Sequence, residues 1–382
     1  MTMVTLNRLN LLMSTRRLAQ VSPSYNAELM MKRIDGKLAL ASFGEGIIGI
    51  EHLPDSFDTD EEIVVSLDKF MTFLQVRYED TISIKINPAT VKLQAGKSSA
   101  TISRSTVRLT VSIPDNDSKV GEISSSAFDD LARVANISDD KDSSRPILNG
   151  TYFVFSPGDI RALTANGIAF GYAWEQSSGV TVNGKEEFLI KATALGIAQR
   201  YDWQGEPRIK IYRSPKYQNK VCFSNGVSYL YLSELAEKEK FPLNYLLDSS
   251  KDSVSKFNFT VESAAFKSFV DAAVKLSSYD DRSVTVALAN GNVMISSGKR
   301  LKHEVEEQGL EFNGFFEIMN PAKFGNDFIF CLDAKMTKQM ISLLNQVDKG
   351  GQLRVAMGEG TGLIFFSTSI ANALYGIVQI SR

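Results

Sequence analysis

The chain has 382 residues, a hydrophobic share of 43% and a formal net charge of −2, which suits a globular protein of two to four domains. Its two cysteines, Cys222 and Cys331, lie far apart, which argues against a disulfide scaffold and a cysteine-rich metal site. No stretch approaches 18 apolar residues, so no transmembrane helix is expected.

The first third of the chain reads as a helix, a hairpin, a strand that enters a second helix, and a closing pair of strands. The first helix is expected over 9–21, where apolar residues recur at helical spacing. The hairpin spans 27–43 and turns at Asp35-Gly36. Residues 61–76 run from strand into helix, and 81–103 supply the closing strands.

The middle third repeats this order. A helix is expected over 122–135, followed by β-rich runs within 145–175. Residues 186–202 again run from strand into helix, 207–214 alternate with period two, and 220–234 form a hairpin around Asn225-Gly226.

The last third repeats it once more. A helix is expected over 261–276 and a hairpin over 283–297. Residues 326–346 run from strand into helix, 352–368 form a second hairpin, and 373–380 form a closing strand.

These patterns predict an α+β protein of three repeated domains, 1–118, 119–253 and 254–382, joined by polar connections. The alternative is a coincidence of generic α+β patterning. Adjacent acidic pairs, Asp139-Asp140 and Asp280-Asp281, follow the first helix in the second and third repeats, which supports the repeat rather than catalysis.

The six expected helices carry more basic than acidic residues, although the whole chain is slightly acidic. Such an arc of repeats can line one side with helices and close on a partner as a symmetric ring. Its inner wall would then face phosphates through contacts that ignore sequence. The alternative is that each basic side chain is an ordinary solvated residue. The basic residues are Arg8, Arg16, Arg17, Lys69, Arg77, Arg133, Lys191, Arg200, Lys267, Lys275, Lys335 and Lys338.

Enzyme motifs are weak. The segment 95–98 (Ala-Gly-Lys-Ser) has the end of a phosphate-binding loop, but Val91 stands where that loop needs its first glycine, so a tight turn explains it better. The two histidines, His52 and His303, have no partner at metal-ligand spacing. Trp174 and Trp203 could stack on bases, but their positions on or beside strands favour a structural role. We therefore expect no catalytic residues, metal or cofactor.

Several segments resemble the bacterial DNA polymerase III beta sliding clamp over nearly the whole chain. Residues 145–150 (Arg-Pro-Ile-Leu-Asn-Gly) are similar to a signature of that family's second domain. Residues 166–170 (Asn-Gly-Ile-Ala-Phe) stand where the family usually has Asp-Gly-His-Arg-Leu, and Phe241-Pro242 matches the Phe-Pro that ends the second domain. The chain ends, like the family, in a hydrophobic strand, but Gln379 replaces the usual proline.

The resemblance implies the DNA clamp fold: three clamp domains with helices inside and sheets outside, forming half of a ring that two chains close head to tail. It implies a groove between the second and third domains for a short hydrophobic motif of partner proteins. The departures at Ile168-Ala169 and Gln379 put the family's motif in doubt and would suit a phage or plasmid clamp. The groove residues are Gly167, Ile168, Phe170, Pro242, Leu246, Leu247, Val378 and Ile380, for which core packing is the alternative.

The resemblance also places the ring-closing interface. The edge strand around Ala100 and Ile102 would meet the region near Val274 and Leu276 of a second chain. We therefore expect a non-enzymatic processivity factor in the cytoplasm, with double-stranded DNA, a DNA polymerase, a clamp loader and a second copy as partners. The alternatives are a clamp-like scaffold that binds partner peptides without encircling DNA, and a hydrolase or transferase on an unfamiliar fold.

Overall fold

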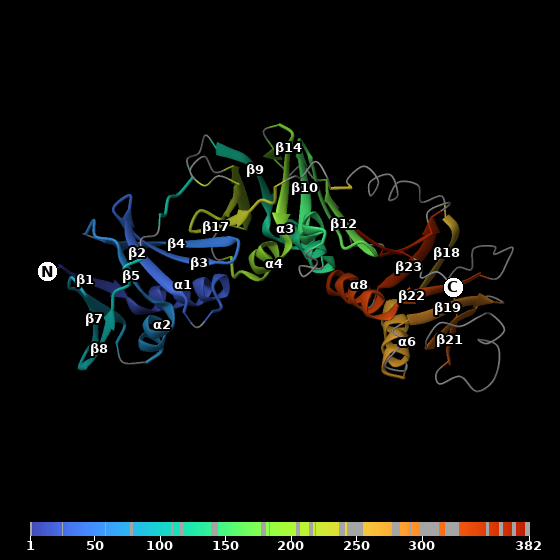
Figure 1. Ribbon diagram of the computed structural model, residues 1–382, viewed down its shortest axis with the longest axis horizontal. Coiled ribbons are helices and arrows are strands. Elements are labelled where there is room, and N and C mark those ends of the chain that lie inside the picture. Colours follow the sequence, from blue (N-terminus) through green and yellow to red (C-terminus); the bar gives the residue numbers. More distant parts are fainter. Residues whose placement is uncertain are drawn as a thin grey trace. The chain divides into compact units, whose positions relative to one another are not determined.

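The structure is a computed structural model of the chain (Figure 1). It describes residues 2–24, 26–57, 59–76, 79–107, 110–114, 118–138, 144–176, 181–182, 184–203, 207–213, 217, 219–236, 241–242, 255–276, 283–289, 292–297, 313–317, 328–348, 351–358, 362–368 and 372–378. Within these residues, no helix is long and apolar enough to cross a membrane.

Most of the regular structure is β-sheet. The α-helices are α1 (Arg8–Val21), α2 (Leu67–Gln75), α3 (Ser125–Ala132), α4 (Ala192–Arg200), α6 (Ser263–Leu276) and α8 (Ala334–Val347), and short 3-10 helices are η2 (Arg133–Ile137) and η3 (Pro146–Asn149). The strands are β1 (Thr2–Asn7), β2 (Glu28–Ile34), β3 (Lys37–Gly44), β4 (Ile47–Ser56), β5 (Ile63–Ser66), β6 (Thr81–Ile86), β7 (Thr90–Ala95), β8 (Ser98–Ser103), β9 (Lys119–Ser124), β10 (Gly150–Ser156), β11 (Asp159–Ala165), β12 (Ala169–Glu175), β13 (Thr181–Val182), β14 (Glu186–Lys191), β15 (Arg208–Arg213), β16 (Lys220–Ser224), β17 (Ser228–Ser233), β18 (Ser255–Glu262), β19 (Ser283–Ala289), β20 (Asn292–Ser297), β21 (Asn313–Glu317), β22 (Phe328–Asp333), β23 (Gln352–Gly358), β24 (Leu363–Thr368) and β25 (Ala373–Val378).

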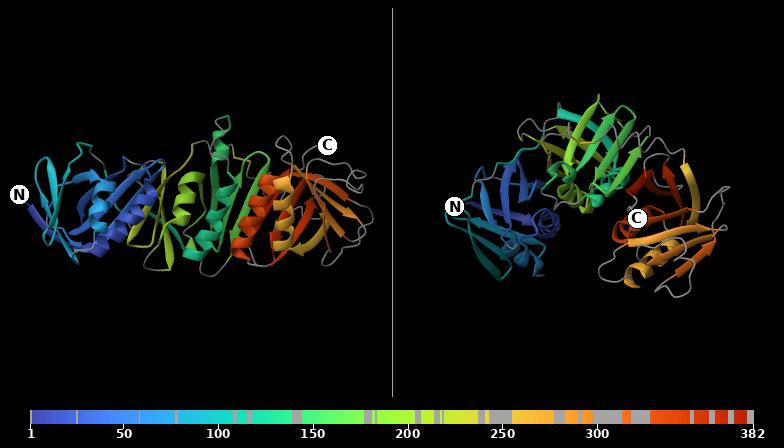
Figure 2. Two further views of the ribbon diagram at one scale, coloured as in Figure 1. Left: turned by 90° about the horizontal axis from the view of Figure 1, so that it is seen from below. Right: turned by 45° about the vertical axis from the view of Figure 1, so that its right-hand side comes forward.

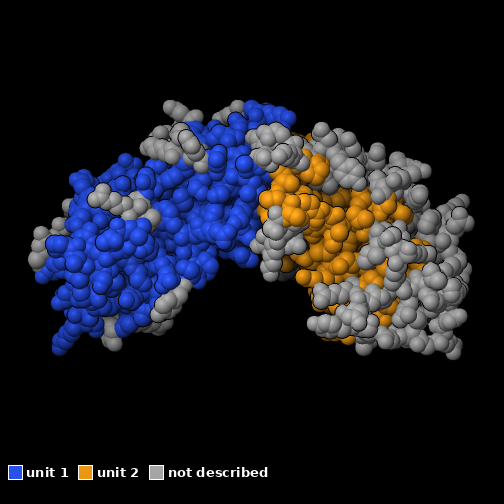
Figure 3. All heavy atoms as spheres, in the orientation of Figure 1, with its two compact units in different colours: residues 1–128, 155–158, 177–236 blue, residues 129–154, 159–176, 237–382 orange. Residues whose placement is uncertain are grey.

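The chain divides into two compact units (Figure 3). Unit 1 comprises residues 1–128, 155–158 and 177–236, and unit 2 comprises 129–154, 159–176 and 237–382. This division cuts through the predicted second domain, so the three-domain boundaries stay a prediction.

Helices begin where strands end, and the last strand residue often caps the helix. The side chain of Asn7 accepts a hydrogen bond from the backbone N–H of Asn10 (3.0 Å), and that of Asp333 accepts one from Met336 (2.7 Å). Ser66 and Ser124 cap α2 and α3 in the same way. Such side chains satisfy the otherwise unpaired donors of the first helical turn. These caps explain why the sequence predicts a helix directly after a strand in each repeat.

A nine-stranded sheet forms the centre of unit 1, in the order β13-β9-β15-β16-β17-β4-β3-β2-β5. The strands β17 and β4 are antiparallel neighbours, although they come from the expected second and first domains. A second sheet, β1-β6-β7-β8, has β8 at its edge. Leu11, Leu40, Phe70 and Leu93 belong to the core beneath these elements.

The helices of unit 1 lie on one side of the nine-stranded sheet (Figure 2). Gly49 has no side chain, and the position of its missing Cβ is within 3.5 Å of both α1 (Val21, Leu18) and Leu230 of β17. On the same face, Phe128 of α3 packs on Phe223, with ring centroids 5.1 Å apart. The sheet that spans the expected domain boundary therefore carries all of these helices on one face.

A tyrosine cluster covers the opposite face of this sheet. Tyr231 donates a hydrogen bond to the carbonyl oxygen of Ser112 (2.8 Å), and Tyr217 donates one to that of Thr110 (2.8 Å). The segment 110–114, which leads from the first expected domain to the second, is thereby tied across the strands. Buried Cys222 lies within the same cluster.

This tyrosine cluster predicts loss of stability at alkaline pH. Burial raises the pKa of Tyr212 to about 12, and burial also raises the pKa of Tyr231 and of the Cys222 thiol. The unfolded chain loses these protons above about pH 8.5 to 10, whereas the folded chain retains them, so unfolding becomes more favourable as pH rises. We expect the melting temperature to fall steeply between pH 8 and pH 11. Tyr231→Phe should make that fall shallower, and a melting temperature independent of pH would contradict the explanation.

In unit 2, strands run in the order β10-β11-β12-β25-β24-β23-β18, and a separate sheet runs β21-β20-β19-β22. Helices α6 and α8 pack against each other, and Lys338 of α8 pairs with Asp271 of α6 at 2.8 Å. Phe266 of α6 contacts Phe366 of β24, with ring centroids 6.3 Å apart. Here too, strands of the expected second and third domains, β12 and β25, are antiparallel neighbours.

The predicted α+β fold class is confirmed. The sequence prediction missed the strand that precedes the first helix of each repeat (β1, β9 and β18), and the helix expected over 261–276 begins at Ser263, where β18 ends. The hairpin turns at Asp35-Gly36 and Asn225-Gly226 are where the sequence placed them, with Asp35, Gly36 and Gly226 at positive φ. The turn of the hairpin over 283–297 lies outside the described residues.

The segment 122–135, which was expected to form a helix with its serines as possible caps, contains α3, and Ser124 at the end of β9 caps that helix. Its last residues, from Arg133, belong to η2 instead of the α-helix.

Candidate functional site

Five helices each present an exposed basic side chain. Within the part of the chain that the structure describes, none of these five residues forms an ion pair or side-chain hydrogen bond, and all five side chains are exposed. Exposed arginine and lysine side chains of this kind suit phosphate groups. The five, called here the helix bases, are Arg16 of α1, Lys69 of α2, Arg200 of α4, Lys275 of α6 and Lys335 of α8.

Arg17, also predicted to face DNA, is instead buried. Its side chain is 6% exposed and forms an ion pair with Glu51, which is fully buried on β4. The hydroxyl of Tyr201, after α4, donates to the other carboxylate oxygen of Glu51. Burial opposes the charge of Arg17, but the hydrogen bond and the attraction of Glu51 outweigh it and raise the pKa of the guanidinium. Arg17 therefore joins α1, β4 and the end of α4 inside the protein, and its guanidinium is not on the surface.

Four further predicted basic residues have partners within the protein. Arg8 donates to the carbonyl oxygens of Glu79 and Leu74, which anchors the end of α2. Arg133, Lys191 and Lys338 pair with Asp130, Glu45 and Asp271 respectively. Lys267 is half-buried on α6, and Arg77 lies outside the described residues. The sequence identified basic helix residues but could not separate internal partners from free charges.

An apolar pocket of about 300 Å³ lies in unit 2, where β12 begins and β25 ends. Ile168 and Val378 are unusually exposed for their type, at 47% and 45%, and the backbone N–H of Val378 donates to the carbonyl oxygen of Ile168 (2.8 Å). Phe170 forms part of the wall, held edge-on against Phe365 with ring centroids 5.9 Å apart. Gly376 makes this possible, because any side chain there would collide with the Phe170 ring.

The predicted groove residues Gly167, Ile168, Phe170, Pro242 and Val378 all line this pocket. Leu246, Leu247 and Ile380 lie outside the described residues. The sequence analysis missed further lining residues that no local pattern marks, because they come together only through the pairing of β12 with β25. These are Arg145, Leu148, Ala165, Ala169 and Leu363.

The two junctions between repeats use one strand register. Tyr229 of β17 faces Ile50 of β4, and Leu374 of β25 faces Tyr172 of β12. Ile50 and Tyr172 are equivalent, since they face Ala41 and Leu163, which each stand five residues after the glycine of the first hairpin turn.

Tyr229 and Leu374 are equivalent by the same kind of count. The residue that stands two positions before the end of the repeat's first strand is Glu122 in one repeat and Thr260 in the other. When the facing residues are followed from strand to strand across the sheet, Glu122 leads to Tyr229 and Thr260 leads to Leu374. In the first repeat the corresponding residue is Thr5, two positions before the end of β1, and the same succession of facing residues leads from it to Ser99 of β8. The repeat thus supplies a third strand position of this kind in β8.

The complementary position is on β21. Ser296 stands five residues after the glycine of its hairpin turn and faces Asn313 of β21. In the described part of the chain, β8 pairs only with β7 and β21 only with β20. Each internal junction pairs a strand of one kind (β17 or β25) with a strand of the other kind (β4 or β12). Among the described residues, β8 is the unpaired strand of the first kind and β21 is the unpaired strand of the second kind.

The residues predicted for ring closure lie on or near these edges. Ala100 and Ile102 are on β8, but Ile102 is only 4% exposed and already packs in the core of unit 1. Val274 is half-buried on α6, which packs against β20 and β21. Leu276 ends α6, and its side chain lies outside the described residues. The free strand edge beside α6 is β21, which the sequence analysis did not select.

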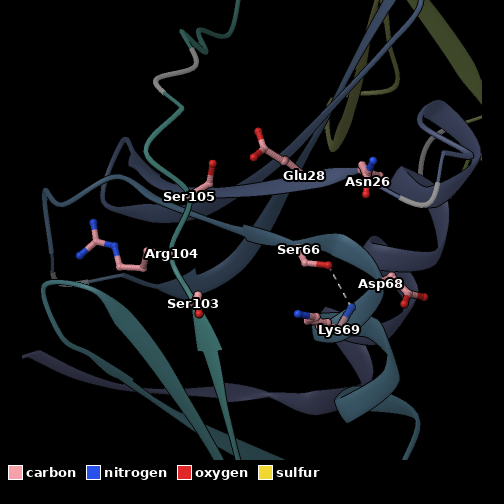
Figure 4. Close-up of a pocket in the computed structure, with 9 residues that line it drawn as sticks. Asn26, Glu28, Ser66, Asp68, Lys69, Ser103, Arg104 and Ser105 are labelled. Carbon is pink, nitrogen blue, oxygen red and sulfur yellow. Dashed lines mark hydrogen bonds between the residues drawn. The ribbon is translucent and has the colours of Figure 1, made fainter.

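A polar pocket in unit 1 lies beside the end of β8 (Figure 4). Ser66, Asp68 and Lys69 line it from the start of α2, and Ser103 lines it from β8. The guanidinium of Arg104 turns away from Lys69 and pairs with Glu61. Lys69 is thus a helix base that also lies next to a free strand edge.

Within the described residues, no group of three or more metal-ligating side chains occurs. Trp203 donates its indole N–H to the carbonyl oxygen of Ala198 and packs edge-on against Phe128. Trp174 stacks on Tyr172, with ring centroids 5.2 Å apart. Both tryptophans therefore have the structural surroundings that the sequence favoured.

The combination of strand-into-helix repeats, sheets that continue across repeat boundaries and helices on one sheet face defines the fold of the DNA sliding clamps. Within that class the fold is that of the bacterial DNA polymerase III beta subunit. The chain is similar to the Pseudomonas aeruginosa DNA polymerase III subunit beta, with a TM-score of 0.82, 14% identity and 100% of both chains covered. It is also similar to the Bacillus subtilis sliding clamp (TM-score 0.81, 14% identity, 100% of this chain and 99% of that one).

A third similar structure is the Helicobacter pylori beta clamp bound to a DNA ligase peptide, with a TM-score of 0.75, 14% identity and 100% of both chains covered. Neither a family model nor a curated protein sequence matches the chain. At this level of identity the likeness concerns the fold alone.

Proposed function

We propose that the chain is a DNA sliding clamp, a non-enzymatic processivity factor that encircles duplex DNA and tethers a replicative polymerase. Three clamp domains, 1–118, 119–253 and 254–382, make half of the ring, and two chains close it head to tail. Helices line the inside and sheets form the outside. A clamp loader opens the ring, and the protein acts in the cytoplasm at the replication fork.

The observation that carries the proposal is the pair of complementary free edges. The same antiparallel register joins β17 to β4 and β25 to β12, and it leaves β8 and β21 at opposite ends of the repeat. An exposed strand edge is a natural site for association with another chain. A head-to-tail contact that closes gives a ring rather than a filament.

The helix bases support DNA as the ligand inside that ring. One exposed basic side chain on each of five helices distributes positive charge along the repeat, although the formal net charge of the whole chain is −2. Contacts of this kind bind the backbone without reading its sequence. Weak individual contacts allow sliding, and closure of the ring prevents release. The apolar pocket would hold a hydrophobic peptide segment of the polymerase or another partner.

The register predicts a specific covalent dimer. If β8 pairs with β21 of a second copy as β17 pairs with β4, Ser99 faces Asn313 of that copy. The variant Ser99→Cys with Asn313→Cys should therefore oxidise to a dimer closed by two disulfides, since facing residues lie within disulfide reach. The native cysteines, Cys222 and Cys331, are buried and should not interfere.

A shifted pair provides the control for this dimer. Ser103→Cys with Asn313→Cys moves one thiol four residues along β8 and should give little cross-linking, because the Cα atoms would exceed about 7 Å. Product size on non-reducing gels and by mass photometry is the measurement. Equal cross-linking of both variants, or none of either, would contradict the register, and a ladder of long chains would contradict a two-chain ring.

A clamp-like scaffold that does not encircle DNA would share the pocket but would not need the helix bases. Reversing the charge of the helix bases separates the two proposals. A clamp would lose DNA, whereas a scaffold would keep its peptide binding and lose no function.

A further inference from the structure

Two of the helix bases are sequence neighbours of buried residues that belong to one polar network in unit 1. Arg16 directly precedes Arg17 on α1, and Arg200, the last residue of α4, directly precedes Tyr201. Arg16 and Arg200 are exposed, whereas Arg17 and Tyr201 are buried. Each of the two helices therefore carries an exposed cation next to a buried polar side chain.

Glu51 joins the two buried side chains through different oxygen atoms. Its Oε2 accepts hydrogen bonds from Nε of Arg17 (2.9 Å) and from Nη2, and its Oε1 accepts one from the hydroxyl of Tyr201. Burial and the charge of Glu51 raise the pKa of Tyr201 well above its ordinary value, so the hydroxyl keeps its proton and remains a donor. One fully buried carboxylate thus holds both α1 of the first expected domain and the end of α4 of the second.

The backbone connects this network to the exposed cations. The N–H of Tyr201 donates to the carbonyl oxygen of Ala198 (3.3 Å), so Tyr201 closes the last turn of α4 and fixes the backbone that carries Arg200. Glu51 faces Ser228 of β17 across the pairing of β4 with β17, which places the carboxylate at the junction of the two expected domains. A shift of this carboxylate would therefore move the backbone on both sides of the junction.

We propose that Glu51 is a positioning residue for DNA binding. Through its two buried partners it sets the orientation of Arg16 and Arg200 relative to each other, so that both reach phosphates of one duplex. This rests on the proposed function of the helix bases as DNA contacts. The phosphates of a duplex recur at a fixed spacing, and cations that are held in place before binding lose less conformational freedom when they bind.

Tyr201→Phe tests this proposal, since it removes one hydroxyl and leaves the ion pair of Arg17 with Glu51 intact. We expect binding of the full-length protein to a long linear duplex to weaken about fivefold at low salt. The slope of log affinity against log salt should fall by about 1, because one phosphate contact is lost. The matched control is Tyr231→Phe, which removes a buried tyrosine hydroxyl from the opposite face of the same sheet and should change neither quantity.

A second substitution separates positioning from a general loosening of the fold. If Tyr201→Phe acts through Arg200, it should cause no further loss of affinity in the Arg200→Gln background. The full loss should remain in the Lys275→Gln background, because Lys275 lies on α6 in unit 2. Arg17→Lys keeps the charge but not the planar pair of donors, so it should weaken binding through Arg16 and have no effect in the Arg16→Gln background.

Each variant is measured well below its melting temperature, so that unfolding does not contribute. Equal losses from Tyr201→Phe with and without Arg200, or no loss in either, would overturn the positioning role alone. Retention of DNA by the variant in which all five helix bases become glutamate would overturn the proposed function as well.

Discussion

Duplex DNA is expected to be lost by a variant in which all five helix bases become glutamate: Arg16→Glu, Lys69→Glu, Arg200→Glu, Lys275→Glu and Lys335→Glu. Each basic side chain that neutralises a phosphate releases counterions. The logarithm of the affinity therefore falls with the logarithm of the salt concentration, with a slope of about 0.9 per contact. Removal of five contacts should lower the slope of log affinity against log salt by roughly 4 to 5 and weaken binding at least about 1000-fold at low salt. Binding to a long duplex, measured across a salt series, gives both quantities.

The control variant carries the same change of net charge elsewhere. Lys37, Lys92, Lys97, Lys185 and Arg354 are exposed residues of strands and turns, and none belongs to a helix. Their replacement by glutamate should leave most of the affinity and most of the salt slope. If both variants lose DNA equally, total charge rather than the helix bases governs binding. If neither does, the helices do not face DNA.

A second large effect is expected at the buried ion pair of unit 1. Glu51→Ala leaves the guanidinium of Arg17 charged and buried without its partner, and it also removes the acceptor of the Tyr201 hydroxyl. Breaking a buried pair from one side costs about 3–5 kcal/mol. We therefore expect the melting temperature of unit 1 to fall by roughly 10 °C. Thermal unfolding followed by tryptophan fluorescence reports it, because Trp203 lies in that unit.

The double variant Arg17→Met with Glu51→Leu should be more stable than Glu51→Ala, since it removes both charges. The pair of Lys191 with Glu45, in which the carboxylate is exposed and the lysine half-buried, serves as the comparison. Glu45 lies in a turn, and Lys191 holds the pKa of its carboxyl below the ordinary value. Glu45→Ala should leave the melting temperature unchanged. A double variant as unstable as Glu51→Ala would show that packing, not the unpaired charge, determines the loss.

Much of the fold could be predicted because the local patterns agree with one another. Asn7, Ser66 and Asp333 each end a strand and cap the next helix, so the change from period two to helical spacing is sharp in the sequence. The hairpin at Asp35-Gly36 is equally clear, since both residues adopt positive φ. Three occurrences of one order made the repeat visible before any tertiary contact was known.

The candidate sites were less predictable because they depend on contacts between distant residues. Arg16 and Arg17 are neighbours in sequence, yet one is exposed and the other pairs with Glu51 on a strand. No helical pattern could reveal that strand partner. Arg145 lines the apolar pocket beside Gly167, far from most of the other lining residues in sequence. Within the described residues, β21 lies at a sheet edge because it pairs with β20, whose other neighbour is β19.

Topological retention on DNA tests the central proposal most directly. The variant Ser99→Cys with Asn313→Cys is mixed in reduced form with nicked circular duplex, oxidised, and washed at high salt. We expect the covalent ring to stay on the circle and to leave after a single restriction cut, whereas the single variant Ser99→Cys should wash off both forms. Release of the cross-linked dimer from intact circles, or retention after the cut, would contradict encirclement of DNA.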